Sequence, residues 1–406
     1  ARQPTPAPEA KGYTLSKELY DRAVAYSREE HEVYFVGVAY GALLLIVILA
    51  ARWGPRFRDA AERASRFRFV QAVVFTSILT IVLAILRLPV STYSHWLSLS
   101  YDQSVQSWPS WIWDAAKSEL IAVVIGSFIV WVMYGIIRRS PRRWWFYFWL
   151  TTIPFTVFTA IVEPVFIAPL FFTFEPLQTR QPALAAQIER VAERGGLTIE
   201  QSRMFEMNAS DKMKSLNAYV TGFGPSKRVV VYDTTIAKMT TPQILFIFGH
   251  EMGHYVLGHI VKGMVVAEVT LLVGLYLAFL WINREVSRRG QRWGIRGVED
   301  WASLPALMLF AAVSSFLMTP ALNAYSRHDE HQADVYGLEV THSIVPDSGE
   351  VAAQAFQVLG EADLGDPNPS PFVKFWFLDH PSLNDRILFA RSYDPWSKGE
   401  PPEFVR

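Results

Sequence analysis

The chain has 406 residues, of which 51% are hydrophobic, and its 38 lysines and arginines are balanced by 38 aspartates and glutamates. A net charge of zero, without a basic stripe interleaved with aromatic residues in any soluble stretch, excludes nucleic acid as a partner. The absence of cysteine excludes disulfides, thiolate metal sites and a cysteine nucleophile. The chain starts at Ala1 in a proline-rich stretch, which fits a removed signal peptide or a trimmed chain.

Six long uncharged runs predict six membrane-spanning helices. A bilayer core requires about 20 apolar helical residues, and the aromatic and arginine residues at the edges of these runs are typical of membrane interfaces. A soluble protein with six buried helices is the alternative, and it does not explain these edges. The lipid bilayer is therefore the expected partner of the runs Val33–Ala51, Phe69–Leu86, Ile121–Ile137, Trp144–Val162, Val269–Ile282 and Leu304–Leu322.

The predicted fold is mainly α, a polytopic membrane helix bundle with a split α+β domain. Within the first soluble segment, Leu184–Arg194 is expected to be a helix that ends at two glycines, and Arg203–Met207 and Arg228–Tyr232 are expected to be strands. The two soluble segments are expected to assemble into one domain. The predicted units are an N-terminal extension with an amphipathic segment (1–32), four transmembrane helices (33–172), a first soluble part (173–263), two transmembrane helices (264–322) and a second soluble part (323–406).

The distribution of arginine predicts the orientation in the membrane. The loops after the first, third and fifth runs carry six, four and five arginines, and they alternate with loops that are poor in arginine. The positive-inside rule places the arginine-rich loops in the cytoplasm. The N-terminus and both soluble segments are then expected on the exoplasmic face, periplasmic or lumenal. Pro154 interrupts the fourth run, and a missed or split span there would reverse this assignment.

The segment His250-Glu251-Met252-Gly253-His254 carries the strongest chemical signal. Residues i and i+4 of a helix lie on the same face, so His250 and His254 can bind one metal ion. Glu251 is near enough to accept a proton from a water molecule, and this is the H-E-x-x-H pattern of zinc metallopeptidases. Thr240–Pro242 offers a cap and a first-turn proline for this helix. The pattern requires a third metal ligand elsewhere in the chain.

The best candidates for the third ligand follow the sixth run. Glu330 and Asp334 are again four residues apart, so one of them can bind the metal while the other holds a ligand histidine in place. His328 and His331 are alternative ligands that spacing alone does not exclude. A third histidine of the metzincin type is not present: His259 lies nine residues after the first histidine rather than ten, and we expect it to have a supporting or structural role.

Three motifs in order resemble the type I CAAX prenyl protease family, whose members are integral-membrane zinc proteases. The strand motif Asn217-Ala218-Tyr219-x-x-Gly222 also fits the family, and the likeness runs from about Tyr13 to Ile387. The three motifs are His250-Glu251-x-x-His254, Ser326-Arg327-x-x-Glu330-x-x-Ala333-Asp334 and His380-Pro381-Ser382-x-x-x-Arg386.

The resemblance implies a set of metal ligands. His250, His254 and Glu330 would hold one zinc ion per chain and leave a position open for chemistry. The polar residues Asp334, Arg327 and Arg386 would not bind the metal themselves but would hold the ligand side chains in position.

The resemblance also implies roles in the cleavage of a peptide or protein substrate. Glu251 would act as the general base, and His380 would donate a hydrogen bond to the oxyanion. The alternative for His380 is a histidine that caps a loop before a proline. Asn217, Ala218, Tyr219 and Gly222 would present an edge strand to an extended peptide, and the alternative for them is an ordinary turn.

Family members also have membrane helices that ring a water-filled chamber. Glu163 and Glu268 lie at the ends of apolar runs, and we expect them either to face such a chamber or to reach a membrane interface. Eukaryotic members have seven spans and process prenylated C-termini at the cytosolic side, whereas this chain has six predicted spans and a predicted exoplasmic site.

Three functions are compatible with these features. The first is a zinc-dependent endopeptidase of membrane-associated proteins, prenylated CAAX-type proteins included. The second is a quality-control protease for membrane proteins that has no prenylated substrate. The third is a catalytically silent zinc-binding scaffold, and the intact Glu251 argues against it because a structural metal site needs no general base. No sequence feature indicates an oligomeric state.

Overall fold

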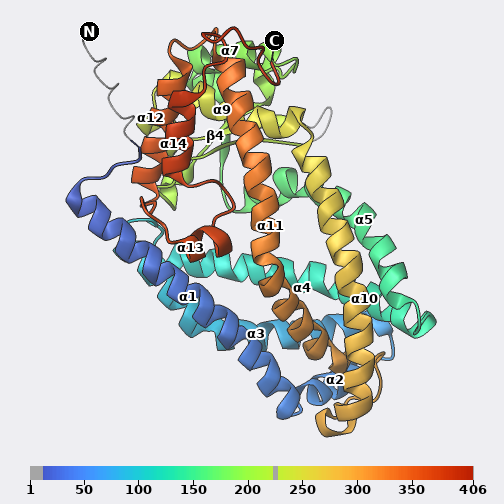
Figure 1. The fold of residues 1–406 in the computed structure, drawn as a ribbon. Helices are drawn as coiled ribbons and strands as arrows, with labels where there is room; N and C mark the ends of the chain where they lie inside the picture. Colours follow the sequence, from blue (N-terminus) through green and yellow to red (C-terminus); the bar gives the residue numbers. More distant parts are fainter. Residues whose placement is uncertain (1–11, 223–226, 406) are drawn as a thin grey trace, which may run out of the picture.

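The computed structural model describes residues 12–222 and 227–405 and consists of long helices beneath a smaller domain with one sheet (Figure 1). Six helices of the described chain are long and apolar enough to cross a membrane, as predicted. The fourth of them is continued by irregular turns as far as Leu170. The six are α1 (Lys17–Ala50), α3 (Arg68–Ser100), α4 (Trp108–Arg139), α5 (Trp144–Val162), α10 (His259–Trp293) and α11 (Leu304–Thr341).

The membrane helices extend well beyond the apolar runs. Helix α1 starts at Lys17, where the Oγ of Ser16 accepts a hydrogen bond from the backbone N–H of Leu19 (3.3 Å). Helix α11 continues without a break to Thr341, so the predicted boundary between residues 322 and 323 falls inside a helix. Polar side chains end an apolar run but do not end a helix, because their helix propensities remain favourable. The sixth span therefore carries Glu330 and Asp334 upward as part of the same rigid element.

The fourth span is continuous through its proline. Pro154 lies inside α5, and the helical geometry changes only later, to a π-turn at Glu163–Ile167 and a 3-10 turn at Ala168–Leu170. Neighbouring helices and threonine hydroxyls can satisfy the backbone groups that a proline frees within a membrane. Pro154 thus does not split the span.

The sheet has four strands in the order β1-β2-β4-β3. The strands β2 and β4 pair in parallel, and the two outer pairs are antiparallel. The predicted strands are confirmed to within one residue, and the Val229–Val231 run of β4 is fully buried, as befits a central strand covered on both faces. The strands are β1 (Phe174–Pro176), β2 (Met204–Met207), β3 (Ala218–Thr221) and β4 (Arg228–Tyr232).

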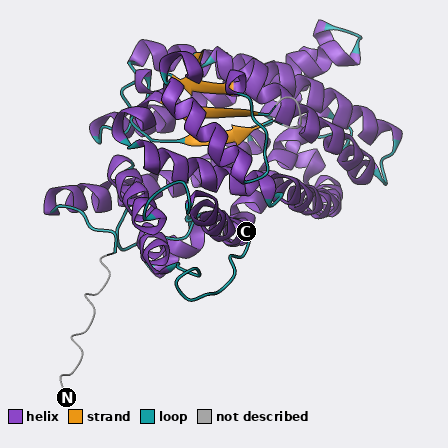
Figure 2. Cartoon of the chain, turned by 90° about the horizontal axis from the view of Figure 1, so that it is seen from above, coloured by secondary structure: helices purple, strands orange, loops and turns teal. Residues whose placement is uncertain are grey.

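Helices from both soluble segments cover the sheet (Figure 2). The buried run Ile244–Phe248 of α9 belongs to the same hydrophobic core as Ala352 and Phe356 of α12, and the rings of Phe246 and Phe356 meet edge-on at 5.3 Å. The two segments therefore share one core. The helices are α6 (Leu177–Arg180), α7 (Pro182–Arg194), α8 (Asp233–Lys238), α9 (Thr241–Val256), α12 (Ser348–Ala362), α13 (Pro371–Trp376) and α14 (Leu383–Ser392).

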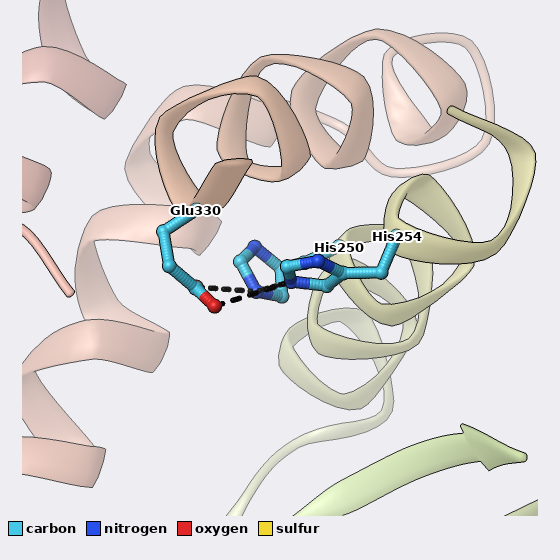
Figure 3. Close-up of side chains that lie close together, drawn as sticks. All are labelled: His250, His254 and Glu330. Atoms are coloured by element: carbon cyan, nitrogen blue, oxygen red, sulfur yellow. Dashed lines mark hydrogen bonds and ion pairs between the residues drawn. The ribbon is translucent and has the colours of Figure 1, made fainter. Parts of the chain in front are cut away.

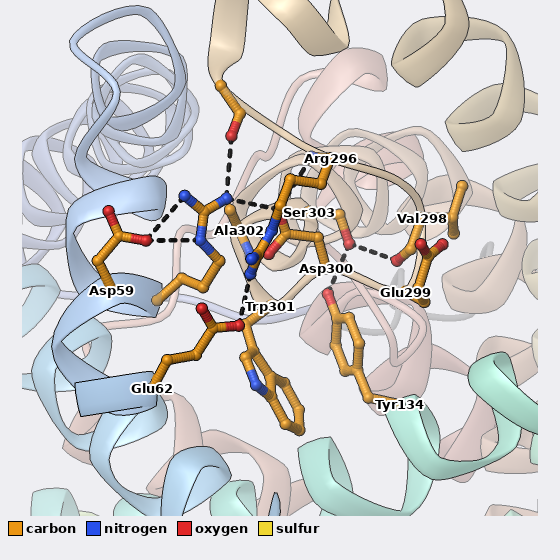
Figure 4. Close-up of polar contacts among 12 residues, drawn as sticks. Asp59, Glu62, Tyr134, Arg296, Val298, Glu299, Asp300, Trp301, Ala302 and Ser303 are labelled. Carbon is orange, nitrogen blue, oxygen red and sulfur yellow. Dashed lines mark hydrogen bonds and ion pairs between the residues drawn. The ribbon is translucent and has the colours of Figure 1, made fainter. Parts of the chain in front are cut away.

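A polar cluster joins the connections at the opposite end of the molecule (Figure 4). From α2 (Trp53–Ala64), the guanidinium of Arg58 donates to the Oδ2 of Asp300 (2.7 Å), whose side chain is only 2% exposed. Arg138, at the end of α4, donates to the backbone carbonyl of Glu299 (3.2 Å). All three arginine-rich connections therefore meet at one end of the molecule. This is expected, because two candidate spans separate each of these connections from the next, and two spans return the chain to the same side.

Candidate active site

Three glycines let α9 and α11 approach each other closely. A Cβ atom on Gly249 would lie 2.8 Å from the Cγ1 of Val340, and one on Gly253 would lie 3.0 Å from the Cβ of Tyr336. In the other direction, a Cβ atom on Gly337 would lie 3.0 Å from the backbone nitrogen of His250. Larger side chains would push the helices apart. The glycines therefore bring the H-E-x-x-H face within reach of the carboxylates of α11.

The two histidines of α9 and Glu330 of α11 converge on one point (Figure 3). The Nε2 of His250 is 3.2 Å from the Oε2 of Glu330, and the Nε2 of His254 is 3.4 Å from its Oε1. The two Nε2 atoms are 3.3 Å apart. Among the described residues, these three form the group whose ligand atoms all lie within 4.8 Å of one another.

This donor set fits a zinc ion. Two imidazole nitrogens and one carboxylate oxygen are the ligands of catalytic zinc sites that keep a fourth position open. The Oε2 of Glu330 is buried and accepts no hydrogen bond of good geometry, although the Nε2 atoms of His250 and His380 lie 3.2 and 3.1 Å from it. A buried oxygen of this kind requires a partner, and a metal cation between the three side chains would supply one.

The alternative ligands lie outside this group. His331 is exposed, and its ring packs against Phe389 with centroids 4.6 Å apart. His328 is also exposed, and it does not belong to the group of three side chains whose possible ligand atoms converge. On the same helical face as Glu330, Asp334 reaches the other nitrogen of His250: its Oδ1 is 2.9 Å from Nδ1. The geometry therefore favours Glu330 as the third ligand and Asp334 as its support.

The two predicted supporting arginines do different things. Arg386 donates to both carboxylate oxygens of Asp334 (2.9 and 2.6 Å), and this buried pair fixes the carboxylate behind His250. Arg327 does not touch the ligands. It donates to the backbone carbonyls of Lys374 and Leu378, so it holds the loop that leads to His380.

The carboxylates around His250 attract positive charge. Burial lowers the pKa of His250, but contacts with Asp334 and Glu330 outweigh it and raise the pKa to about 9. The same field that holds a proton on the ring would hold a metal cation in its place, so metal binding competes with protonation. Desolvation raises the pKa of Glu251, and the neighbouring histidines oppose this rise. A raised pKa suits a carboxylate that must accept and return a proton near neutrality.

His380 faces the same group of side chains. Its Nε2 is 3.1 Å from the Oε2 of Glu330, and its Nδ1 is 2.7 Å from the Oδ1 of Asp379. Desolvation lowers the pKa of His380, but Asp379 and Glu330 outweigh this and raise it to about 9. A ring that is protonated at neutral pH can donate a hydrogen bond to a developing negative charge. The sequence motif gave no indication of the role of Asp379.

A cavity of about 530 Å³ opens beside the three converging side chains and includes Glu251 and His380 in its wall. Its wall also includes Tyr26, Ser27, Glu30 and His31 of α1. The sequence of this helix predicted only a membrane span with an amphipathic beginning. Polar residues ahead of the apolar run were the available signal, but nothing local linked them to a helix more than 200 residues away.

The strand motif is placed along the edge of the sheet. In β3, Ala218 and Val220 are buried in the core, whereas the ring of Tyr219 packs against Tyr232, with centroids 6.3 Å apart. Asn217 lines the cavity beside the converging side chains, and Gly222 lines a second cavity of about 390 Å³. The motif thus connects the two cavities, and the ring of Tyr219 lies outside the first.

The two acidic residues of the apolar runs have different surroundings. Glu268 of α10 accepts hydrogen bonds from the hydroxyls of Thr152 (3.0 Å) and Thr156 (2.7 Å) of α5. Glu163 lines the second cavity together with Thr156. Glu268 therefore joins two membrane helices, and Glu163 faces a cavity.

These features define an integral-membrane metallopeptidase, and comparisons with known proteins identify its family. Residues 178–394 match Peptidase family M48, and residues 1–173 match the family described as CAAX prenyl protease N-terminal, five membrane helices. The chain belongs to Peptidase family M48 and is a multi-pass membrane zinc metalloendopeptidase. In its described residues up to 173 we find four candidate spans, and α2, with 12 residues, is too short to be a fifth.

Individual relatives agree with this assignment. The uncharacterized metalloprotease YhfN of Bacillus subtilis is 36% identical over 91% of this chain and 84% of its own length. CAAX prenyl protease 1 of Saccharomyces cerevisiae is 24% identical over 92% of this chain and 86% of its own. The crystal structure of S. mikatae Ste24p has the same fold, with a TM-score of 0.81, 24% identity, and coverage of 95% of this chain and 93% of that one.

The choice of third ligand can be tested by substitution. We expect Glu330→Ala to lose most of its zinc, because two imidazoles alone hold the ion weakly, whereas His328→Ala and His331→Ala should keep about one zinc per chain. Metal content of the purified proteins, measured by mass spectrometry after dialysis, provides the check. An equal loss of zinc in His331→Ala would transfer the ligand role to that residue.

Proposed function

We propose that His250, His254 and Glu330 hold one catalytic zinc ion and that Glu251 is the general base for peptide-bond hydrolysis. The observation that carries this proposal is the convergence of the Nε2 atoms of His250 and His254 on the buried carboxylate of Glu330, beside the cavity that His250 and Glu251 line. A site with a purely structural role would need neither the open cavity nor the adjacent carboxylate.

The side chains divide the chemistry among themselves. A zinc ion at this site supplies Lewis acidity, which lowers the pKa of water and polarises the scissile carbonyl. Glu251 accepts the proton of the attacking water and then returns it to the leaving amine. The protonated ring of His380 donates a hydrogen bond to the oxyanion of the tetrahedral intermediate. Asp334 and Arg386 keep His250 in the orientation that this chemistry requires.

The edge strand β3 provides a place for the substrate. It pairs with β4 on one side, and its other edge can accept an extended peptide by β-augmentation. Asn217, which directly precedes the strand, lies in the cavity wall with Glu251. A peptide along this edge would therefore pass the converging ligands, with its side chains distributed between the two cavities.

The base assignment is tested by Glu251→Gln. We expect the variant to retain about one zinc per chain, because Glu251 is not a ligand, and to lose peptide hydrolysis by at least about 10²-fold, because the amide does not accept the proton. Metal analysis and cleavage of a quenched fluorescent peptide are measured on the same samples. The exposed Glu193→Gln is the matched control and should behave as wild type. Loss of zinc in Glu251→Gln would make this residue a ligand rather than the base.

The charge of the cavity favours a second substrate class beside prenylated C-termini, namely internal segments of membrane-associated proteins. Five carboxylates line the cavity, and the only lysine or arginine in its described wall, Arg386, is engaged by Asp334. The α-carboxylate of a C-a-a-X box lies three residues after its cysteine, at most about 10 Å along an extended chain. A free C-terminus that extends away from the cationic His250 and His380, toward Asp363 and Asp366, would therefore meet like charge. The five carboxylates are Glu30, Glu251, Asp363, Asp366 and Asp379.

A pair of peptides tests this preference. Two farnesylated peptides with the same C-a-a-X sequence differ only in a free or an amidated C-terminus. We expect the amidated peptide to have a kcat/KM about five- to tenfold higher, which corresponds to roughly 1–1.4 kcal/mol of repulsion. Desolvation raises the pKa of Asp363 to about 7, opposed by Lys238, so its carboxylate ionises and the preference grows as the pH rises through 7. Faster cleavage of the free acid would instead assign this chain to C-terminal processing.

We further propose that the catalytic domain lies on the exoplasmic side. The three arginine-rich connections meet at the end of the molecule opposite this domain (Figures 1 and 4), and short arginine-rich loops are retained in the cytoplasm. One candidate span separates the second and third of these loops from the soluble segment that follows each, and this supports the proposed orientation.

Cysteine labelling tests the orientation without interference, because the chain has no native cysteine. We expect Ser397→Cys, in the exposed C-terminal tail, to react with a membrane-impermeant maleimide in intact cells or spheroplasts. The exposed Ser287→Cys, at the arginine-rich end of α10, is the control with the opposite expectation and should react only after lysis. The reverse pattern would place the catalytic domain in the cytosol.

A further inference from the structure

The Nδ1 atoms of the two proposed ligand histidines of α9 have different hydrogen-bond partners. His250 has the carboxylate of Asp334 at its Nδ1, whereas the Nδ1 of His254 faces another imidazole, that of His259, at 3.1 Å. The other ring nitrogen of His259, Nε2, lies 3.0 Å from the Oε1 of Gln332. His259 is 5% exposed, so this contact is shielded from water. Zinc-bound histidines usually have a carboxylate, carbonyl or water at this position.

The hydrogen-bond chemistry of the three side chains defines the proton positions. An amide oxygen only accepts hydrogen bonds, so the Nε2 of His259 carries the proton and donates it to Gln332. In a neutral imidazole the other nitrogen then has a lone pair, and the Nδ1 of His259 accepts a hydrogen bond from the Nδ1–H of His254. This leaves the lone pair of His254 on Nε2, the atom that faces His250 and Glu330.

The backbone brings His259 back toward His254 at the junction of two helices. Helix α9 ends at Val256, and Gly258 adopts φ +74°, the left-handed conformation that glycine tolerates best. His259 is the first residue of the membrane helix α10, and Gln332 lies on α11. A further polar neighbour, Asp329, is 3.9 Å from the Nε2 of His259, beyond hydrogen-bond distance.

We propose that His259, held by Gln332, is a positioning residue that fixes the tautomer and ring orientation of the zinc ligand His254. The proposal rests on the assignment of His254 as a ligand. It connects His254 by hydrogen bonds to the first residue of α10 and to Gln332 of α11, whereas Asp334 of α11 and Arg386 of α14 support the other ligand, His250. His259 itself binds no metal, because both of its nitrogens are occupied.

Zinc affinity, measured by chelator competition on the full chain in detergent, tests this role. We expect His259→Leu to weaken zinc binding by about 10–100-fold, the usual effect of removing such a partner. His259→Asn should restore most of the affinity, because its Oδ1 can accept the hydrogen bond from His254 near the position of the lost Nδ1. His331→Leu, which removes an exposed histidine of the same chain, should bind zinc as wild type does.

Two further measurements distinguish positioning from folding and from the proposed function itself. Gln332→Leu leaves His259 in place but removes its acceptor, so it should also weaken zinc binding while the metal-free protein elutes as a single species in size-exclusion chromatography. Wild-type affinity in His259→Leu, or equal weakening in His259→Leu and His259→Asn, would overturn the proposal. Zinc binding that is unaffected by His254→Ala would instead overturn the ligand assignment on which the proposal rests.

Discussion

The close packing of α9 against α11 is the constraint on which the site depends. Gly249, Gly253 and Gly337 let the two backbones approach closely, and at this separation Glu330 lies 3.2 and 3.4 Å from His250 and His254, the proposed zinc ligands. The resulting cluster of carboxylates and imidazoles is expensive to bury without a compensating charge. A divalent cation at its centre would offset much of that cost, so metal binding and packing of the two helices are expected to stabilise each other.

Helices α10 and α11 connect the candidate membrane spans to the proposed active site. Helix α11 runs from the arginine-rich end, where Asp300 is fixed by Arg58 just before the helix, to the ligand Glu330 and onward to Thr341 without interruption. Helix α10 begins at His259, against the ligand His254. The proposed metal site thus lies where both candidate membrane helices meet the soluble domain.

Local patterns predicted much of this arrangement. The spacing of His250 and His254, and of Glu330 and Asp334, depends only on helix geometry, and the valine run of β4 identified a buried strand. Hydropathy located all six spans but not their ends, because it reports which part of a helix suits lipid and not where the helix stops. The resemblance to a known family supplied the order of the motifs, which spacing alone does not provide.

The features that the sequence did not predict are all contacts between distant segments. Glu30 and His31 reach the cavity only because α1 packs beside the C-terminal segment, where the ring of His31 stacks on Phe377 with centroids 3.9 Å apart. The pairing of His259 with Gln332 spans 73 residues, and no periodicity indicates such a partner. The role of Asp379 depends on where the loop before His380 is placed, which in turn depends on Arg327.

The central claim is that one zinc ion lies between α9 and α11. The most direct measurement is anomalous diffraction from crystals of the zinc-loaded protein, with data collected on both sides of the zinc absorption edge. We expect a single strong peak per chain, about 2.0–2.2 Å from the Nε2 atoms of His250 and His254 and from a carboxylate oxygen of Glu330. A peak bound instead by His259, His328 or His331 would contradict it.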